Sequence, residues 1–258
     1  MYYAIQAETV LMPAGDEEMV EAYLAWPLGP GPFASVVVVH HAPGYDEATK
    51  EITRSLATAG MVAICPNLYT PESRLGDDPK EVAKKVRFAG GVSDERVVRY
   101  VDAAARYLRA RLAANGCVGV IGYCTGGRQA VLAACQLEVQ AAVDCYGAYV
   151  TRSTPPGDPL PRASIAEHLG NLSCPLLGLF GAEDPAPSLE EVAELEKVLK
   201  ELGKLYQFHV YDNAGHAFFS VDSTKYRTEA ALDGWKKVRD WFSWHLTPPT
   251  TAVKDTQR

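Results

Sequence analysis

The residues with the clearest chemical potential lie in the segment Gly122-Tyr-Cys-Thr-Gly-Gly127, where a cysteine stands between two glycines. The segment follows an apolar stretch, 117–121, that is typical of a buried strand, and it precedes a helix predicted over 126–135. Such a turn between strand and helix holds its central residue on a strained corner. The positive end of the helix dipole favours a thiolate at Cys124. The segment therefore predicts a nucleophile, and a tight turn around a buried, inert cysteine is the alternative.

A nucleophile of this kind needs a base, and the base needs a carboxylate that orients it. On sites built around such a turn, the chain order is nucleophile, acid, histidine. His216 follows a strand predicted over 205–211, and Asp184 follows one predicted over 176–180. Both positions are at carboxyl ends of strands, where parallel sheets build their sites. We therefore expect His216 and Asp184 to serve Cys124, with Glu183 as a competing carboxylate.

The elements that position these residues are read from the hydrophobic pattern. Two alternating stretches, 2–11 and 18–26, predict edge strands. Further strands are predicted at 35–40, 61–65, 117–121, 141–145, 176–180 and 205–211. Helices are predicted at 46–59, 79–89, 93–112, 126–135, 188–202 and 223–245. This alternation indicates an α/β fold with a mainly parallel, twisted sheet and helices on both faces.

The chain shows no internal repeat and no linker that would separate two domains. We therefore predict one domain over 1–246. The segment 149–170 begins with a stretch rich in proline and polar residues, and it reads as an inserted cap. The segment 247–258 begins with Thr-Pro-Pro-Thr-Thr and predicts a disordered tail.

Composition limits the classes of function. The chain has 258 residues, 47% of them hydrophobic, and a net charge of −7. These values exclude a disordered chain, and the negative charge argues against unspecific binding to nucleic acid or acidic membranes. No apolar run is long enough to cross a bilayer, and the N-terminus has no pattern of a secretion signal. The six cysteines include no Cys-x-x-Cys pair, which favours a reducing cytoplasm.

Four segments together resemble the dienelactone hydrolase family (carboxymethylenebutenolidases). They are Cys65-Pro-Asn-Leu-Tyr69, the cysteine turn at 122–127, Gly181-Ala-Glu-Asp184 and Ala214-Gly-His-Ala-Phe218. The resemblance extends from the first strands to about residue 246. It implies a single-domain α/β-hydrolase fold with a Cys-His-Asp triad.

The resemblance also assigns roles to single residues. It makes Cys124 the nucleophile, His216 the base and Asp184 the residue that orients the base. It assigns the oxyanion hole to the backbone N–H groups of Thr125 and Ala42. Such donors each contribute about 3–4 kcal/mol to transition-state stabilisation.

Two positions depart from the family pattern. Family members that cleave dienelactones carry a glutamate where this chain has His41, and an arginine that pairs with the substrate carboxylate where it has Ser220. His41 is either a second hydrogen-bonding imidazole near the thiol or a wall of the pocket. Arg74 and Arg87 correspond only loosely to a second substrate-binding arginine, so a less charged substrate is favoured. Candidate pocket residues are His41, Tyr45, Tyr69, Tyr146, Phe218, Phe219 and Ser220, although aromatic residues at strand ends also suit a core.

The sequence thus predicts a hydrolase that cleaves small esters or lactones through a thioester acyl-enzyme. No metal or cofactor is expected, because the histidines and cysteines lack ligand spacing. Alternatives are a small-molecule receptor without turnover, a promiscuous hydrolase of activated aryl esters or phosphoesters, and an oxidant sensor at Cys124. The expected partner is the small-molecule substrate, with no nucleic acid or membrane, for a monomer or homodimer.

Overall fold

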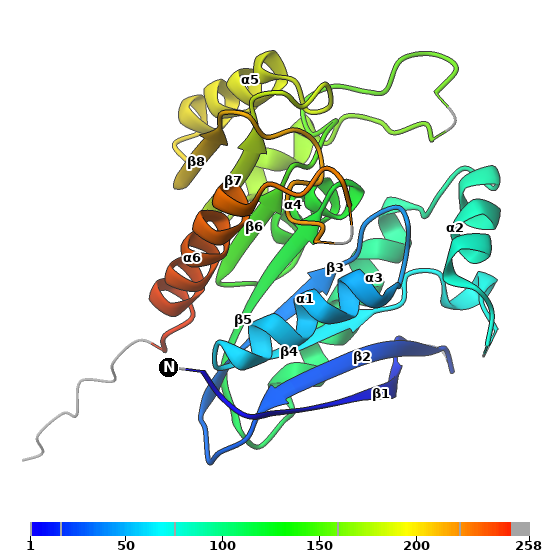
Figure 1. Cartoon of the computed structure of the whole chain (residues 1–258), viewed down its shortest axis with the longest axis vertical. Helices are drawn as coiled ribbons and strands as arrows, with labels where there is room; N and C mark the ends of the chain where they lie inside the picture. Colours follow the sequence, from blue (N-terminus) through cyan, green and yellow to red (C-terminus); the bar gives the residue numbers. More distant parts are fainter. Residues whose placement is uncertain (1, 16, 75, 159, 222, 249–258) are drawn as a thin grey trace, which may run out of the picture.

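The computed structural model describes residues 2–248 except residues 16, 75, 159 and 222. Its centre is an eight-stranded sheet with the order β1-β2-β4-β3-β5-β6-β7-β8 (Figure 1). The pairs β1–β2 and β2–β4 are antiparallel, and every later pair is parallel. The strands are β1 (Ile5–Pro13), β2 (Met19–Pro27), β3 (Phe33–Val39), β4 (Met61–Pro66), β5 (Ala114–Tyr123), β6 (Ala141–Cys145), β7 (Leu176–Gly181) and β8 (Tyr206–Tyr211).

The central strands are covered on both faces, as their unbroken apolar sequences predict. In β3, Val36 and Val38 belong to one hydrophobic cluster, whereas Val37 and Val39 belong to the other. Successive side chains of a strand point to opposite faces, so a continuous valine run supplies both cores at once. The α/β sheet with two covered faces is therefore confirmed.

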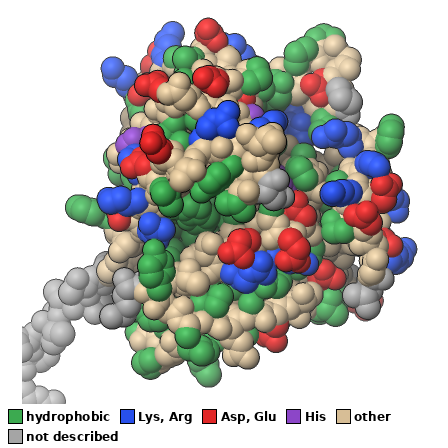
Figure 2. All heavy atoms as spheres, in the orientation of Figure 1, with side chains coloured by type: hydrophobic (Ala, Val, Ile, Leu, Met, Phe, Trp, Pro, Cys, Tyr) green, Lys and Arg blue, Asp and Glu red, His purple; other side chains and the backbone are tan. Residues whose placement is uncertain are grey.

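Two groups of helices form these layers. One face is packed by α1 (Glu47–Thr58) and α6 (Thr228–His245), and hydrophobic side chains gather in a hollow between them (Figure 2). The other face is packed by α2 (Pro79–Phe88), α3 (Asp94–Arg109), α4 (Thr125–Gln136) and α5 (Leu189–Glu201). The short helices are η1 (Thr70–Glu72) and η2 (Ala166–Asn171). Among the described residues, no helix combines the length and apolarity that a membrane span requires.

The last helix differs from its predicted bounds. It begins at Thr228, whereas the sequence pattern places its start at 223. The preceding backbone is used by loop contacts, since Lys225 N–H donates to Ser223 Oγ and Arg227 N–H donates to Phe218 O. These N–H groups therefore hold the loop before α6 instead of a first helical turn.

The segment predicted as a cap, 149–170, is an excursion that ends in η2. Its two arms are tied near their base, where Thr154 N–H donates to Arg162 O and Ile165 N–H donates to Val150 O. Figure 1 shows the excursion extending from the top of the sheet between β6 and β7. Of the predicted tail, residues 249–258 lie outside the described residues.

Candidate active site

The strand-to-helix corner holds Cys124 in a strained backbone conformation. Its φ is +56° and its ψ −123°, values that a non-glycine residue rarely adopts. The two flanking glycines make the corner possible. A Cβ atom at Gly122 would lie 1.8 Å from Gly126 O, and one at Gly126 would lie 2.3 Å from Val39 O. The spacing of the glycines is therefore required by close backbone packing around the cysteine.

Two loops at the same sheet edge bring a histidine and a carboxylate together. His216 Nδ1 lies 2.8 Å from Asp184 Oδ2. The Asp184 side chain is fully buried, and its Oδ1 accepts the N–H of Ala186 at 2.9 Å. The competing carboxylate, Glu183, is exposed. With Nδ1 on Asp184, Nε2 is the imidazole nitrogen left to exchange a proton with the thiol, which is the arrangement a general base requires.

The ionisation of the cysteine and the histidine is coupled. Burial raises the pKa of Cys124, but a hydrogen bond to His216, the charge of that imidazole and the Thr125 N–H outweigh it and lower the pKa to about 7. Burial lowers the pKa of His216, but hydrogen bonds to Asp184 and Cys124 outweigh it and raise the pKa. Both directions favour a thiolate–imidazolium pair near neutral pH, and a thiolate is the reactive form.

Two N–H groups are assigned to the oxyanion hole. The N–H of Thr125 lies next to the thiol, and the N–H of Ala42 belongs to the loop after β3. Thr125 is the first residue of α4, and its N–H bonds to Cys124. The N–H of Ala42 donates to no backbone or side-chain acceptor within the described part of the chain. Ala42 and Thr125 line the same small cavity of about 20 Å³, which has room for one water molecule.

A larger cavity of about 330 Å³ opens beside the thiol. It is lined by Cys124, Thr125, Tyr149, Arg162, His216 and Lys225, among others. Thr125 and Arg162 also line the small cavity, so both cavities meet at these two residues. The volume of the large cavity lies at the lower end of the range typical of small-molecule sites.

The aromatic residues expected in the pocket lie elsewhere. Tyr146, Phe218 and Phe219 are buried beneath the site, and the Tyr146 ring packs edge-on against His216 at a centroid distance of 5.2 Å. Tyr45 lines a separate cavity near Lys50. None of these residues lines the cavity beside the thiol, because strand-end aromatic rings here complete the core.

The other expected pocket residues have supporting positions. The hydroxyl of Tyr69 donates to Ala42 O at 2.9 Å, and Tyr69 lines the small cavity. Ser220 lies near the Tyr146 hydroxyl beneath the site. Arg87 lines the small cavity, whereas Arg74 lies in the separate cavity with Tyr45.

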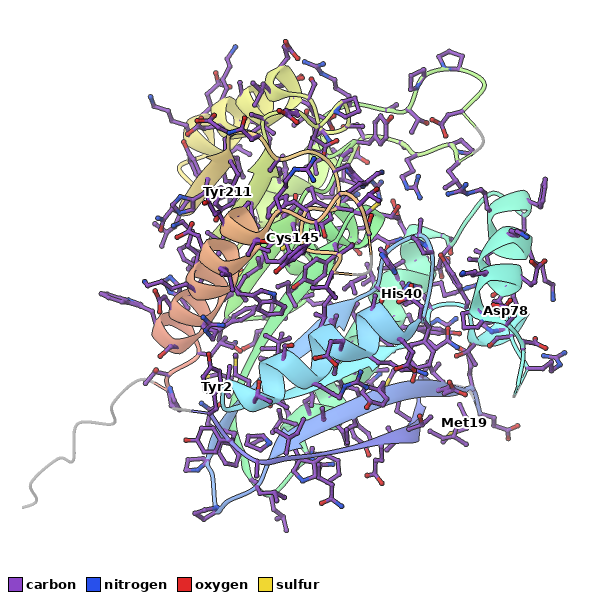
Figure 3. The ribbon with its side chains drawn as sticks, in the orientation of Figure 1. Tyr2, Met19, His40, Asp78, Cys145 and Tyr211 are labelled. Atoms are coloured by element: carbon purple, nitrogen blue, oxygen red, sulfur yellow. The ribbon has the colours of Figure 1, made fainter. Side chains whose placement is uncertain are left out.

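The two consecutive histidines after β3 have different partners. His41 Nε2 lies 2.8 Å from Asp46 Oδ2, at the start of α1, and His41 lines the small cavity. His40 is buried, with Nδ1 against His41 O and Nε2 accepting the N–H of Leu68. Burial lowers the pKa of His40 to about 4, so its imidazole is neutral. Figure 3 marks His40 and Cys145 at the same edge of the sheet.

Two functional candidates escaped the sequence analysis. Arg162 and Lys225 bring positive charge to the cavity, although one lies in the predicted cap and the other before α6. Neither is near Cys124 in sequence, and no local motif marks them. Among residues 2–248 outside the gaps, no group of histidine, cysteine, aspartate and glutamate side chains is arranged to hold a metal ion.

Known sequences of one family match most of this chain. The profile described as the dienelactone hydrolase family matches residues 20–246. A protein of Methylorubrum extorquens named "Putative carboxymethylenebutenolidase" is 34% identical over 233 residues, covering 87% of this chain and 76% of that protein. A Bradyrhizobium protein named "Probable 2-oxo-3-(5-oxofuran-2-ylidene)propanoate lactonase" is 32% identical over 234 residues, covering 90% and 92%.

Solved structures give the same result for the fold. The crystal structure of a "Putative Dienelactone Hydrolase" from Klebsiella pneumoniae has a TM-score of 0.81 and 30% identity, covering 93% of this chain and 99% of that one. A dienelactone hydrolase-like promiscuous phosphotriesterase from metagenomic libraries has a TM-score of 0.76 and 22% identity, covering 95% and 100%. The second similarity concerns the fold alone.

Proposed function

The chain belongs to the dienelactone hydrolase family, and from this premise we propose that it hydrolyses small esters or lactones through Cys124, His216 and Asp184. The observation that carries the proposal is the strained cysteine beside an imidazole whose far nitrogen is held by a buried carboxylate at 2.8 Å. That arrangement supplies a nucleophile, a base and an orienting group in one place.

The first half of the reaction forms a thioester. The Cys124 thiolate attacks the carbonyl carbon, and the carbonyl π electrons move to oxygen, which the Thr125 and Ala42 N–H groups stabilise. When the carbonyl re-forms, the bond to the leaving oxygen breaks. The His216 imidazolium gives that oxygen its proton. The leaving alcohol stays attached to the acyl group when the substrate is a lactone.

The second half releases the acid. Neutral His216 takes a proton from water while the water oxygen attacks the thioester carbonyl. The tetrahedral intermediate then expels the Cys124 thiolate, and the carboxylic acid product loses its proton. Asp184 holds the imidazole in the required tautomer through both halves.

The cavity favours a substrate that carries a negative charge. Arg162 and Lys225 line it, which offsets the absence of an arginine at Ser220. The Bradyrhizobium relative is named for a lactone that bears a carboxylate. We therefore extend the proposal to small anionic lactones and esters, which a guanidinium binds better than neutral analogues.

Steady-state hydrolysis tests this proposal. A chromogenic aryl ester, with and without a carboxylate on the acyl chain, is assayed with wild type, Cys124→Ala and His216→Ala. We expect turnover by the wild type, with a preference for the anionic ester, and a loss of about a thousandfold or more in both variants. Equal rates in all three proteins would contradict the mechanism.

The form of the time course separates an enzyme from a receptor. A hydrolase releases many product molecules per protein molecule, whereas a receptor on this fold gives at most one burst. An aryl phosphotriester in the same assay measures whether activated phosphoesters are also turned over.

A further inference from the structure

The excursion, 149–170, is held so that Arg162 lines the active-site cavity. The backbone of Arg162 pairs with Thr154 through two hydrogen bonds, 3.0 Å from Thr154 N to Arg162 O and 2.9 Å from Arg162 N to Thr154 Oγ1. The buried Arg128 of α4 donates to Tyr149 O at 3.2 Å and to Ala163 O at 2.8 Å. Both arms of the excursion are therefore anchored to the helix that follows the nucleophile.

The Arg162 guanidinium contacts a side chain next to the thiol. Its Nη2 donates to Thr125 Oγ1 at 3.2 Å, and its Nη1 donates to Leu160 O at 3.2 Å. In the described part of the chain this guanidinium forms no salt bridge with a carboxylate. Thr125 Oγ1 in turn lies 3.9 Å from Cys124 Sγ, at the outer limit for a hydrogen bond to sulfur.

The chemistry of these groups sets the direction of each bond. A guanidinium only donates, so Thr125 Oγ1 accepts from Arg162 and keeps its own proton to give. A thiolate only accepts, so that proton is directed to Cys124 Sγ. We propose that Arg162 is a positioning residue that acts through the Thr125 hydroxyl to stabilise the Cys124 thiolate. This inference rests on the proposed function, because it concerns the same nucleophile.

Other charged and titratable groups face this relay from the surrounding elements. Those that line the two cavities or act on Cys124 or Arg162 are His216, Asp184, Lys225, Asp144, Tyr146, Tyr149, Tyr69, Arg128, Asp158, His41 and Arg87. Burial lowers the pKa of Arg162, with the charge of Arg128 acting in the same direction and the Cys124 thiolate opposing both. The same groups are present in every variant of Thr125 and Arg162, so their contribution to the Cys124 pKa is common to all the proteins compared.

The test measures the rate of Cys124 alkylation by iodoacetamide between pH 5 and 10. The variants are Thr125→Val, which keeps the shape and removes the hydroxyl, Arg162→Met, and the double variant. We expect each single variant to lower the alkylation rate at pH 6 about threefold to tenfold and to move the pH midpoint upward. Because Arg162 acts through the hydroxyl, the double variant should match Thr125→Val. Arg162→Lys should restore part of the rate.

Control variants separate an effect of the relay from a general effect of substitution. Arg152→Gln, in the same excursion but paired with Glu194, should leave the profile unchanged. Circular dichroism checks that each variant is folded. Unchanged profiles in Thr125→Val would overturn the proposal. Equal effects of Arg162→Met in both backgrounds would overturn it too, because they would indicate a direct field without the hydroxyl. A change in KM for anionic esters with an unchanged alkylation profile in Arg162→Met would overturn the relay and leave Arg162 with substrate binding alone.

This measurement does not depend on turnover. If the wild type alkylates with a low midpoint but hydrolyses no ester, the proposed function fails and the relay remains testable. If esters are hydrolysed but the relay variants alkylate as the wild type does, only the relay fails.

Discussion

At the scale of residues, the site depends on a pair of groups that ionise each other. Cys124 is partly buried, and burial alone would keep its thiol protonated. The hydrogen bond to His216 reverses that effect, and the buried Asp184 carboxylate makes the imidazole a stronger base. The thiol therefore depends on the imidazole for its lowered pKa, whereas the raised pKa of the imidazole comes from Asp184 and from the thiol together.

The pH dependence of thiol reactivity follows from this pairing. The pKa of Cys124 is lowered to about 7, so its alkylation rate should rise between pH 6 and 8. The alkylation rate of an ordinary thiol rises around its pKa of 9.0. In His216→Ala the midpoint should move to higher pH, because burial is then opposed only by the hydrogen bonds from Thr125. Mass spectrometry of the labelled protein measures this. Cys124→Ala is the control, since the other five cysteines are buried.

The orienting carboxylate gives a second prediction. Asp184→Asn should lower kcat by on the order of a thousandfold or more with little change in KM, because the amide does not hold the required tautomer of His216. Steady-state kinetics on an aryl ester measures the effect. Glu183→Gln is the matched control at the exposed neighbouring position, and a comparable loss there would contradict the assignment to Asp184.

At the scale of elements, the strand β5, its corner and the helix α4 act as one rigid support. The glycines let backbone from β3 and α4 approach so closely that Cys124 is held at a positive φ. The strain is maintained by packing on both sides of the corner. The position of the nucleophile is therefore a property of three elements and not of the cysteine itself.

A single methyl group tests this support. Gly122→Ala should reduce the free energy of unfolding by about 3 kcal/mol or more, since its Cβ would lie 1.8 Å from Gly126 O. Urea denaturation measures the loss. Gly170→Ala is the matched control, because its Cβ would meet no heavy atom within 4 Å. Similar midpoints for both variants would contradict the steric argument.

The anchor of the excursion is a second property of α4. Arg128 is buried, forms two bonds to Asp94 at 2.7 and 2.8 Å, and holds the carbonyls of Tyr149 and Ala163. Arg128→Met should destabilise the fold by about 2 kcal/mol, because the Asp94 carboxylate and the carbonyls of Tyr149 and Ala163 lose their donor.

The same variant should also loosen the excursion. We expect limited proteolysis to cut Arg128→Met within 149–163 faster than the wild type. Arg152→Met, with an exposed arginine of the same segment, is the control. Equal cleavage rates in Arg128→Met and the wild type would show that Arg128 does not anchor the segment.

At the scale of the whole molecule, net charge and local charge have opposite signs. The chain carries −7, and side chains of both signs are interspersed over the face in Figure 2. The active-site cavity nevertheless contains Arg162 and Lys225, next to the positive end of α4. The overall negative charge repels large polyanions, whereas the positive side chains of the cavity attract small anionic ligands.

The net charge predicts no unspecific affinity for nucleic acid. Fluorescence anisotropy of a labelled DNA duplex at physiological salt should stay constant up to about 100 μM protein, where basic proteins already bind. A basic DNA-binding protein serves as the positive control. Saturable binding in the micromolar range would contradict the charge argument.

Patterns local to the chain predict the mainly parallel strands, the helices between them and the loops that carry Cys124, His216 and Asp184. These features follow from interactions that are local along the chain, namely side-chain periodicity, the glycines around the cysteine and the breaks after strands. The family resemblance predicts the roles of those residues.

The surroundings of the thiol come from contacts between segments that lie far apart in the sequence. Arg162 reaches the cavity from an excursion anchored by Arg128, while the expected aromatic residues Tyr146, Phe218 and Phe219 turn into the core. The lining of a cavity depends on how distant loops pack against one another, and no periodicity or spacing in the sequence records that packing.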